Sequence, residues 1–215
     1  MLVGGISMKS FSELAQSVTF ATKGSKIVLN DKNPALQLIG EGRSAFAFRI
    51  GTTNKVLKVF FPPFVHVAKE EALIYQMLKG VSFFPTMYES GPNYIVIDFI
   101  EGETLYNCLV KGLPIASSHI KEIDKALFLA EKKGLNPSDI HLRNIFITTS
   151  GEIKIIDVAR YRQIKNCNQW DDLKKVYDHF YKHPIFPKRL PQFLLNLLAN
   201  MYKKNFFKII LELIP

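Results

Sequence analysis

Three polar side chains in the second half of the chain have the types and spacing of a metal–phosphate site. Asp139 and Asn144 are separated by four residues, and Asp157 follows thirteen residues after Asn144. Residues 145–148 and 153–156 read as two strands joined by a short turn, which would bring Asn144 and Asp157 to the same end of a hairpin. Asn and Asp oxygens suit Mg²⁺ bound together with phosphates. The pattern predicts Asn144 and Asp157 as metal ligands and Asp139 as acceptor of a hydroxyl proton, although each residue alone also suits a turn or a cap.

A glycine-containing turn in the first half could bind the phosphates. Gly40 and Gly42 lie between two predicted strands, residues 36–39 and 45–50. A dinucleotide-binding glycine motif must open a helix, whereas this turn joins two strands. Glycines here let the backbone approach a nucleotide and direct N–H groups at anionic oxygens. An ordinary hairpin turn is the alternative for this segment taken alone.

Lys58 lies inside an apolar strand predicted over residues 55–61. Burying an ammonium alone is costly, so Lys58 must be paired or must point at a ligand. The helix predicted over residues 65–78 offers Glu70 and Glu71 as partners. A Lys–Glu pair that holds the lysine against α- and β-phosphates is the expected arrangement, and a solvated surface charge is the alternative.

The elements that must position these residues change character along the chain. Residues 1–99 are mostly predicted strands with one helix, and residues 100–215 are mostly predicted helices that carry the Asp139, Asn144 and Asp157 loops. The first part adds strands predicted over 26–30, 86–89 and 94–99, and the second adds helices predicted over 118–133, 170–183 and 191–214. In the helix over 65–78, the residues expected on one side are Val65, Ala68, Ala72 and Tyr75.

The order of these motifs resembles that of the protein kinase superfamily. The glycine turn, Val56-Leu57-Lys58, the helix glutamate, the D-x-x-x-x-N spacing and Asp157 follow one another between about residues 39 and 170. The resemblance implies a bilobal α+β fold, in which an antiparallel-sheet N-lobe with one helix (1–99) joins a truncated helical C-lobe (100–215). It also implies an ATP-dependent phosphotransferase that uses ATP and Mg²⁺.

The same resemblance assigns roles to particular residues. Asp139 and Lys58 would be catalytic, Glu71 would pair with Lys58, and Asn144 and Asp157 would bind the metal. Asp98-Phe99-Ile100 would be the hinge whose backbone meets adenine, after Ile97 as the gatekeeper, and Asp172 would brace the catalytic loop. The full set of expected ATP-binding residues is Ile39, Gly40, Glu41, Gly42, Arg43, Ser44, Ala45, Ala47, Lys58, Glu71, Asp98 and Ile100.

Departures from the superfamily pattern narrow the kind of kinase that the sequence predicts. Pro137-Ser138 replaces the usual His-Arg, and only 14 residues separate Asp157 from Asp172, too few for a full activation segment. The chain is therefore similar to minimal bacterial serine/threonine-protein kinases, with Ser or Thr of a protein as acceptor. The alternatives are a small-molecule kinase, which His141 favours, and a pseudokinase that binds a nucleotide or a partner without turnover.

Composition sets the remaining expectations. The chain has 215 residues, a formal net charge of +9 and two cysteines, which excludes a disulfide scaffold or a cysteine zinc site and fits a reducing, cytoplasmic location. The apolar C-terminal stretch is interrupted too often for a spanning helix. Residues 160–215 hold 11 basic and four acidic side chains. This excess could face an acidic partner or a membrane surface, a solvated helix face is the alternative, and nucleic acid is not expected.

Overall fold

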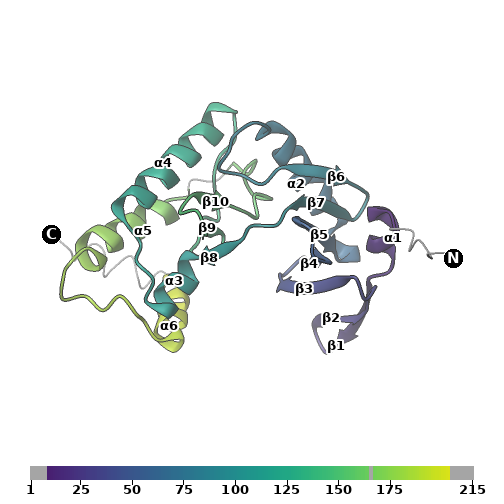
Figure 1. The fold of residues 1–215 in the computed structure, drawn as a ribbon, viewed down its shortest axis with the longest axis horizontal. Helices are drawn as coiled ribbons and strands as arrows, with labels where there is room; N and C mark the ends of the chain where they lie inside the picture. Colours follow the sequence, from purple (N-terminus) through teal and green to yellow (C-terminus); the bar gives the residue numbers. More distant parts are fainter. Residues whose placement is uncertain (1–8, 165–166, 204–215) are drawn as a thin grey trace, which may run out of the picture. The chain divides into compact units, whose positions relative to one another are not determined.

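The chain folds into two compact units, Met1–Ile100 and Glu101–Pro215. The structure is a computed structural model that describes residues 9–164 and 167–203. Figure 1 shows strands concentrated in the first unit and helices in the second, so the predicted α+β class is confirmed. Within the described ranges, no helix combines the length and the apolarity that a bilayer crossing requires.

Five antiparallel strands form the main sheet of the first unit, in the spatial order β3-β4-β5-β7-β6. They are β3 (Leu36–Glu41), β4 (Ala45–Ile50), β5 (Lys55–Phe60), β6 (Met87–Ser90) and β7 (Tyr94–Asp98). A short 3-10 turn, η1 (Pro62–Phe64), leads from β5 into helix α2 (Val65–Met77). These strands and this helix confirm the sequence-based predictions, with ends that differ by at most two residues.

The two faces of β5 are covered by different elements. Leu57 and Val59 point into an apolar cluster that includes Leu14 of α1 (Phe11–Gln16). Lys58 alternates onto the opposite face, against which α2 packs. Both faces of the strand are therefore covered, and Lys58 lies on the face against which α2 packs.

Helix α1 was not expected, so the prediction of a single helix in the first part of the chain is wrong. It begins with a capping box, in which the Ser10 hydroxyl accepts from the Glu13 N–H at 3.2 Å and the Glu13 carboxylate accepts from the Ser10 N–H at 2.6 Å. Six residues are too few to show helical periodicity, but Ser10-x-x-Glu13 is a readable capping signal. The neighbouring two-stranded sheet pairs β1 (Thr19–Lys23), also unexpected, with β2 (Lys26–Asp31).

One residue of α2 departs from the face predicted for it. Ala68, Ala72 and Tyr75 are buried as expected, but Val65 is 42% exposed. Val65 is the first residue of the helix and directly follows the 3-10 turn. The buried stripe includes Glu71 instead, whose side chain faces β5.

The second unit combines helices with a three-stranded antiparallel sheet of order β10-β9-β8 (Figure 1). Its strands are β8 (Gly102–Thr104), β9 (Ile145–Thr148) and β10 (Ile153–Ile155). Its helices are α3 (Leu105–Lys111), α4 (Ser117–Lys132), α5 (Gln169–Val176), the π-helical turn η2 (Tyr177–Tyr181) and α6 (Gln192–Lys203). Three of the predicted helices are thus found, although residues 204–214 of the last lie outside the described residues.

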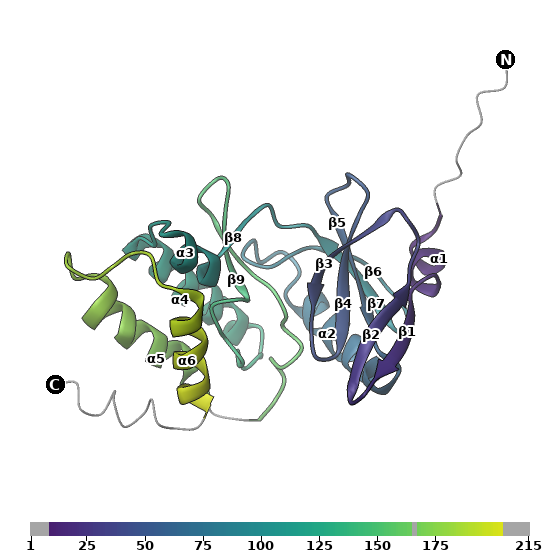
Figure 2. The same ribbon diagram turned by 90° about the horizontal axis from the view of Figure 1, so that it is seen from below.

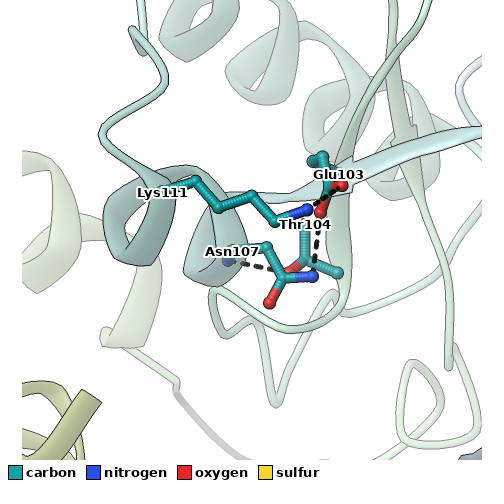
Figure 3. A network of polar contacts seen from close by, with 4 residues as sticks. All are labelled: Glu103, Thr104, Asn107 and Lys111. Carbon is teal, nitrogen blue, oxygen red and sulfur yellow. Dashed lines mark hydrogen bonds and ion pairs between the residues drawn. The ribbon is translucent and has the colours of Figure 1, made fainter. Parts of the chain in front are cut away.

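Strand β8 and helix α3 were not predicted, and they depend on local contacts. At Gly102, φ is 158° and a Cβ would lie 2.3 Å from the Ile147 carbonyl oxygen, so only glycine lets β8 approach β9 this closely. Thr104 caps α3 by accepting from the Asn107 N–H at 3.0 Å. Figure 3 shows Glu103 accepting from the Asn107 amide and from Lys111, and the Lys111 ammonium lowers the pKa of Glu103.

Two polar contacts tie the helices of the second unit to one another. The Trp170 indole N–H of α5 donates to Asp124 of α4 at 2.7 Å. The Tyr106 hydroxyl of α3 donates to Asn196 of α6 at 3.2 Å, and the two helices lie side by side in Figures 1 and 2. These contacts join α5 to α4 and α3 to α6.

Candidate active site

Lys58 and Glu71 form a buried ion pair in the first unit. The Lys58 ammonium donates to both carboxylate oxygens of Glu71, at 2.9 Å and 2.7 Å. The Glu71 side chain is 0% exposed and that of Lys58 is 15% exposed. Of the two glutamates that the sequence offered, the phase of α2 therefore selects Glu71. The pair fixes the ammonium at the surface of the sheet, where it remains partly accessible.

The glycine turn is the expected hairpin between β3 and β4. Gly40 lies opposite Ala47 in the ladder, and the Gly42 N–H donates to the Ala45 carbonyl at 2.9 Å. A β-bulge between Leu38 and Gly40 shifts the register at this point. The φ of Ala45 is not positive, so alanine fits where the superfamily has a third glycine. Ile39 is 44% exposed beside the turn, in the strand that leads into it.

The ladder also places the turn near Lys58. Ala47 pairs with Lys58 across β4 and β5, and Lys58 pairs with Ile95 across β5 and β7. A surface that carries a lysine, a glycine turn and small side chains can accept an anionic ligand along the sheet.

The expected hinge follows β7 in the same unit. The Asp98 carboxylate accepts hydrogen bonds from the Thr86 N–H and the Tyr88 hydroxyl, both at 2.6 Å. The Phe99 N–H donates to the Asn54 carbonyl at 3.0 Å, and Ile97 is buried. The Asp98 side chain is thus engaged by the segment around β6, so any contact of Asp98 with adenine falls to its backbone.

The hairpin of β9 and β10 brings Asn144 and Asp157 to one end, as the spacing predicts. Ile145 pairs with Ile155, and one step further the Ile156 N–H donates to the Asn144 carbonyl at 2.9 Å. The Asn144 side chain is buried, and its amide lies 3.5 Å from the Asp139 carbonyl oxygen. The residue predicted as the base and the asparagine predicted to bind the metal are therefore in contact.

Asp139 and Asp157 share a rare backbone conformation. Both have φ of 60°, and within residues 9–164 and 167–203 they alone, among residues other than glycine, have positive φ. Each such residue costs on the order of 1–3 kcal/mol and persists where the surrounding structure enforces it, typically at functional sites. The strain falls on two of the three residues that the spacing singled out.

Arg160 contacts the predicted base and was missed by the sequence analysis. Its guanidinium Nη1 lies 3.2 Å from Oδ2 of Asp139. The only sequence signal is that Arg160 is the third residue after Asp157. Neither helical nor strand periodicity relates Arg160 to Asp139, which lies 21 positions earlier in the sequence.

Tyr161 reports the electrostatic field around these aspartates. Burial raises the pKa of its hydroxyl strongly, and the negative charges of Asp157 and then Asp139 raise it further. Both carboxylates therefore lie close enough to the buried Tyr161 hydroxyl to act on it.

Three remaining predictions concern the bracing aspartate, the metal ligands and the basic C-terminal stretch. Asp172, which was predicted to brace the catalytic loop, is buried in α5. No group of three or more His, Cys, Asp or Glu side chains suited to a metal occurs within the described ranges, although Mg²⁺ shared with phosphates needs only one or two carboxylates. Lys204 and Lys208, part of the basic stretch expected to meet an acidic partner or membrane, lie outside the described residues.

Comparison with known proteins finds two relatives. The chain is 46% identical over 197 residues, 91% of its length and 92% of the relative's, to "Putative serine/threonine-protein kinase YrzF" of Bacillus subtilis (strain 168). It is 29% identical over 147 residues, 60% of its length, to "Probable serine/threonine-protein kinase CPE1738" of Clostridium perfringens (strain 13 / Type A), of which it covers 22%. No family model matches the chain.

The α+β fold and these similarities define a kinase-like phosphotransferase. At this identity and coverage, the chain belongs to the kinase-like family that includes the Bacillus subtilis protein.

Proposed function

We propose that the protein transfers the γ-phosphoryl group of ATP to a serine or threonine hydroxyl of a protein. One observation supports the proposal most directly. Asp139, the first residue of the D-x-x-x-x-N pattern, and Asp157, thirteen residues after its asparagine, both have positive φ, and Asn144 contacts Asp139. The name of the Bacillus subtilis relative supports the class of acceptor.

In this proposal the phosphate-binding residues and the metal-binding residues have separate roles. Lys58, fixed by Glu71, binds the α- and β-phosphates, and the backbone of the glycine turn covers the triphosphate. Asn144 and Asp157 hold Mg²⁺, which supplies charge neutralisation when bound. Residues Ile39 to Ala47 and the backbone of residues 98–100 bind the nucleotide.

Asp139 acts on the acceptor. Its carboxylate orients the hydroxyl and accepts the hydroxyl proton as the new O–P bond forms, while the bond between the γ-phosphorus and the bridging oxygen breaks and ADP leaves. The side chain is 25% exposed, so an acceptor can reach it. Positioning and charge neutralisation supply most of the rate acceleration in such transfers.

The test is incubation with γ-labelled ATP and Mg²⁺, with and without generic protein acceptors. We expect label on protein from the wild-type chain, none from Asp139→Asn, and an unchanged rate from Asp171→Asn, a matched substitution at a side chain that is 67% exposed on α5. Nucleotide binding should persist in Asp139→Asn. ATP turnover without labelled protein would indicate a small-molecule acceptor, and binding without turnover would indicate a nucleotide-binding module.

A further inference from the structure

The segment that follows Asp157 is fastened to the catalytic loop. The Asn136 N–H donates to the Tyr161 carbonyl at 2.6 Å, and the Asn136 side-chain amide donates to the Gln163 carbonyl at 2.8 Å. The Ser138 hydroxyl donates to the Arg160 carbonyl at 2.7 Å. Three hydrogen bonds thus join residues 136–138 to residues 160–163, directly beside Asp139.

Arg160 adds an ionic contact to this connection. Its guanidinium lies 3.2 Å from the Asp139 carboxylate, and the two side chains are 43% and 25% exposed. The Arg160 carbonyl is meanwhile held by Ser138, whose side chain is buried. The backbone of Arg160 and its side chain are therefore both attached to the loop that carries the predicted base.

The positive φ of Asp139 is a conformation that neighbouring contacts must hold in place. A guanidinium is always charged and is rigid and planar, so it fixes the direction of a carboxylate as well as attracting it. A carboxylate displaced by about 1 Å can cost on the order of 100-fold in rate.

We infer that Arg160 is a positioning residue that holds Asp139 for phosphoryl transfer, so that the catalytic loop is ordered by residues 160–163 without a phosphorylated segment. The inference rests on the proposed function. Ser138 occupies a sequence position where the superfamily has arginine, and its hydroxyl donates to the Arg160 carbonyl. The positive charge beside Asp139 comes instead from Arg160, three residues after Asp157 in the sequence.

The test compares Arg160→Gln, Arg160→Lys and the matched control Arg189→Gln in steady-state transfer assays. Arg189 is exposed in the same unit. We expect Arg160→Gln to lower kcat about 10- to 100-fold and to leave KM for ATP within about twofold, because positioning of the acceptor base is lost and nucleotide binding is not. Arg160→Lys should recover only part of the lost kcat, because its ammonium restores the positive charge but not the planar geometry of the guanidinium. Arg189→Gln should match wild type.

If Trp170 fluorescence shows that Arg160→Gln does not fold, a second variant tests the same connection. Ser138→Ala removes the hydrogen bond to the Arg160 carbonyl and keeps the charge. It should lower kcat several-fold at constant KM for ATP, and hydrogen exchange of residues 136–140 should speed up in step.

The outcomes separate this inference from the proposed function. An inactive wild-type chain overturns both. An active wild type with undiminished kcat in Arg160→Gln, or with kcat raised, overturns the positioning role alone, and a raised kcat would make the contact autoinhibitory. A rise in KM for ATP equal to the loss in kcat/KM would also overturn it, because the residue would then act on nucleotide binding.

Discussion

Replacing Lys58 by methionine should destabilise the first unit by an amount that its buried ion pair sets. The substitution keeps the length of the side chain and removes the ammonium that donates at 2.9 Å and 2.7 Å to Glu71. Glu71 is 0% exposed, so water cannot replace the lost donors. The variant therefore buries a carboxylate without the cation that faced it.

The burial of the two partners sets the magnitude. Removing one partner of a buried pair costs about 3–5 kcal/mol, whereas an exposed pair is worth about 0.2–1 kcal/mol. Because Lys58 is 15% exposed, we expect the lower end, about 3 kcal/mol. The double variant Lys58→Met/Glu71→Leu should recover most of this loss, because apolar replacements of a buried pair are often close to neutral.

The assay must report on the first unit. The single tryptophan, Trp170, lies in the second unit, so its fluorescence alone is insufficient. Hydrogen exchange of peptides from β5 and α2, followed against urea concentration, measures the opening free energy directly. A loss under about 1 kcal/mol in Lys58→Met, or a double variant less stable than the single one, would refute the reasoning.

Three further predictions concern single side chains. Asp157→Ala should abolish the Mg²⁺-dependent part of nucleotide binding, measured by titration with and without chelator, whereas Asp171→Ala should not. Thr104→Ala removes the cap of α3 and should lower the free energy of unfolding by about 1 kcal/mol in denaturant titrations, with no change in the slope. Lys111 lowers the pKa of Glu103 from its ordinary 4.5, so this stabilisation exists above that pH and is lost as pH falls through the folded-state pKa. Thermal midpoints of wild type and Glu103→Gln should therefore differ near pH 7 and converge in acid.

The sequence alone determined the main strands and the identity of the residues that could do chemistry. Two β-rich apolar runs separated by the Gly51–Asn54 turn are a hairpin signal, so β4 and β5 could be read locally. The hairpin of β9 and β10 followed from two short apolar runs and a turn, and it sufficed to bring Asn144 and Asp157 together.

Elements without a period of their own could not be read in this way. Helix α1 has six residues, β8 has three, and both are stabilised by what they pack on. Gly102 looks like an ordinary loop glycine until β9 lies against it. Short elements are selected by tertiary contacts, because their intrinsic propensities are too weak to decide.

The tertiary structure alone decided which charges meet. The sequence offered two glutamates to Lys58, and the rotation of α2 against β5 buries Glu71. The approach of Arg160 to Asp139 depends on how two loops close on each other across 21 positions, through hydrogen bonds from the Asn136 N–H and from the Asn136 and Ser138 side chains. All three hydrogen bonds end on backbone carbonyls, which every residue carries, so the sequence does not show which residues accept them and only the folded chain reveals the contact.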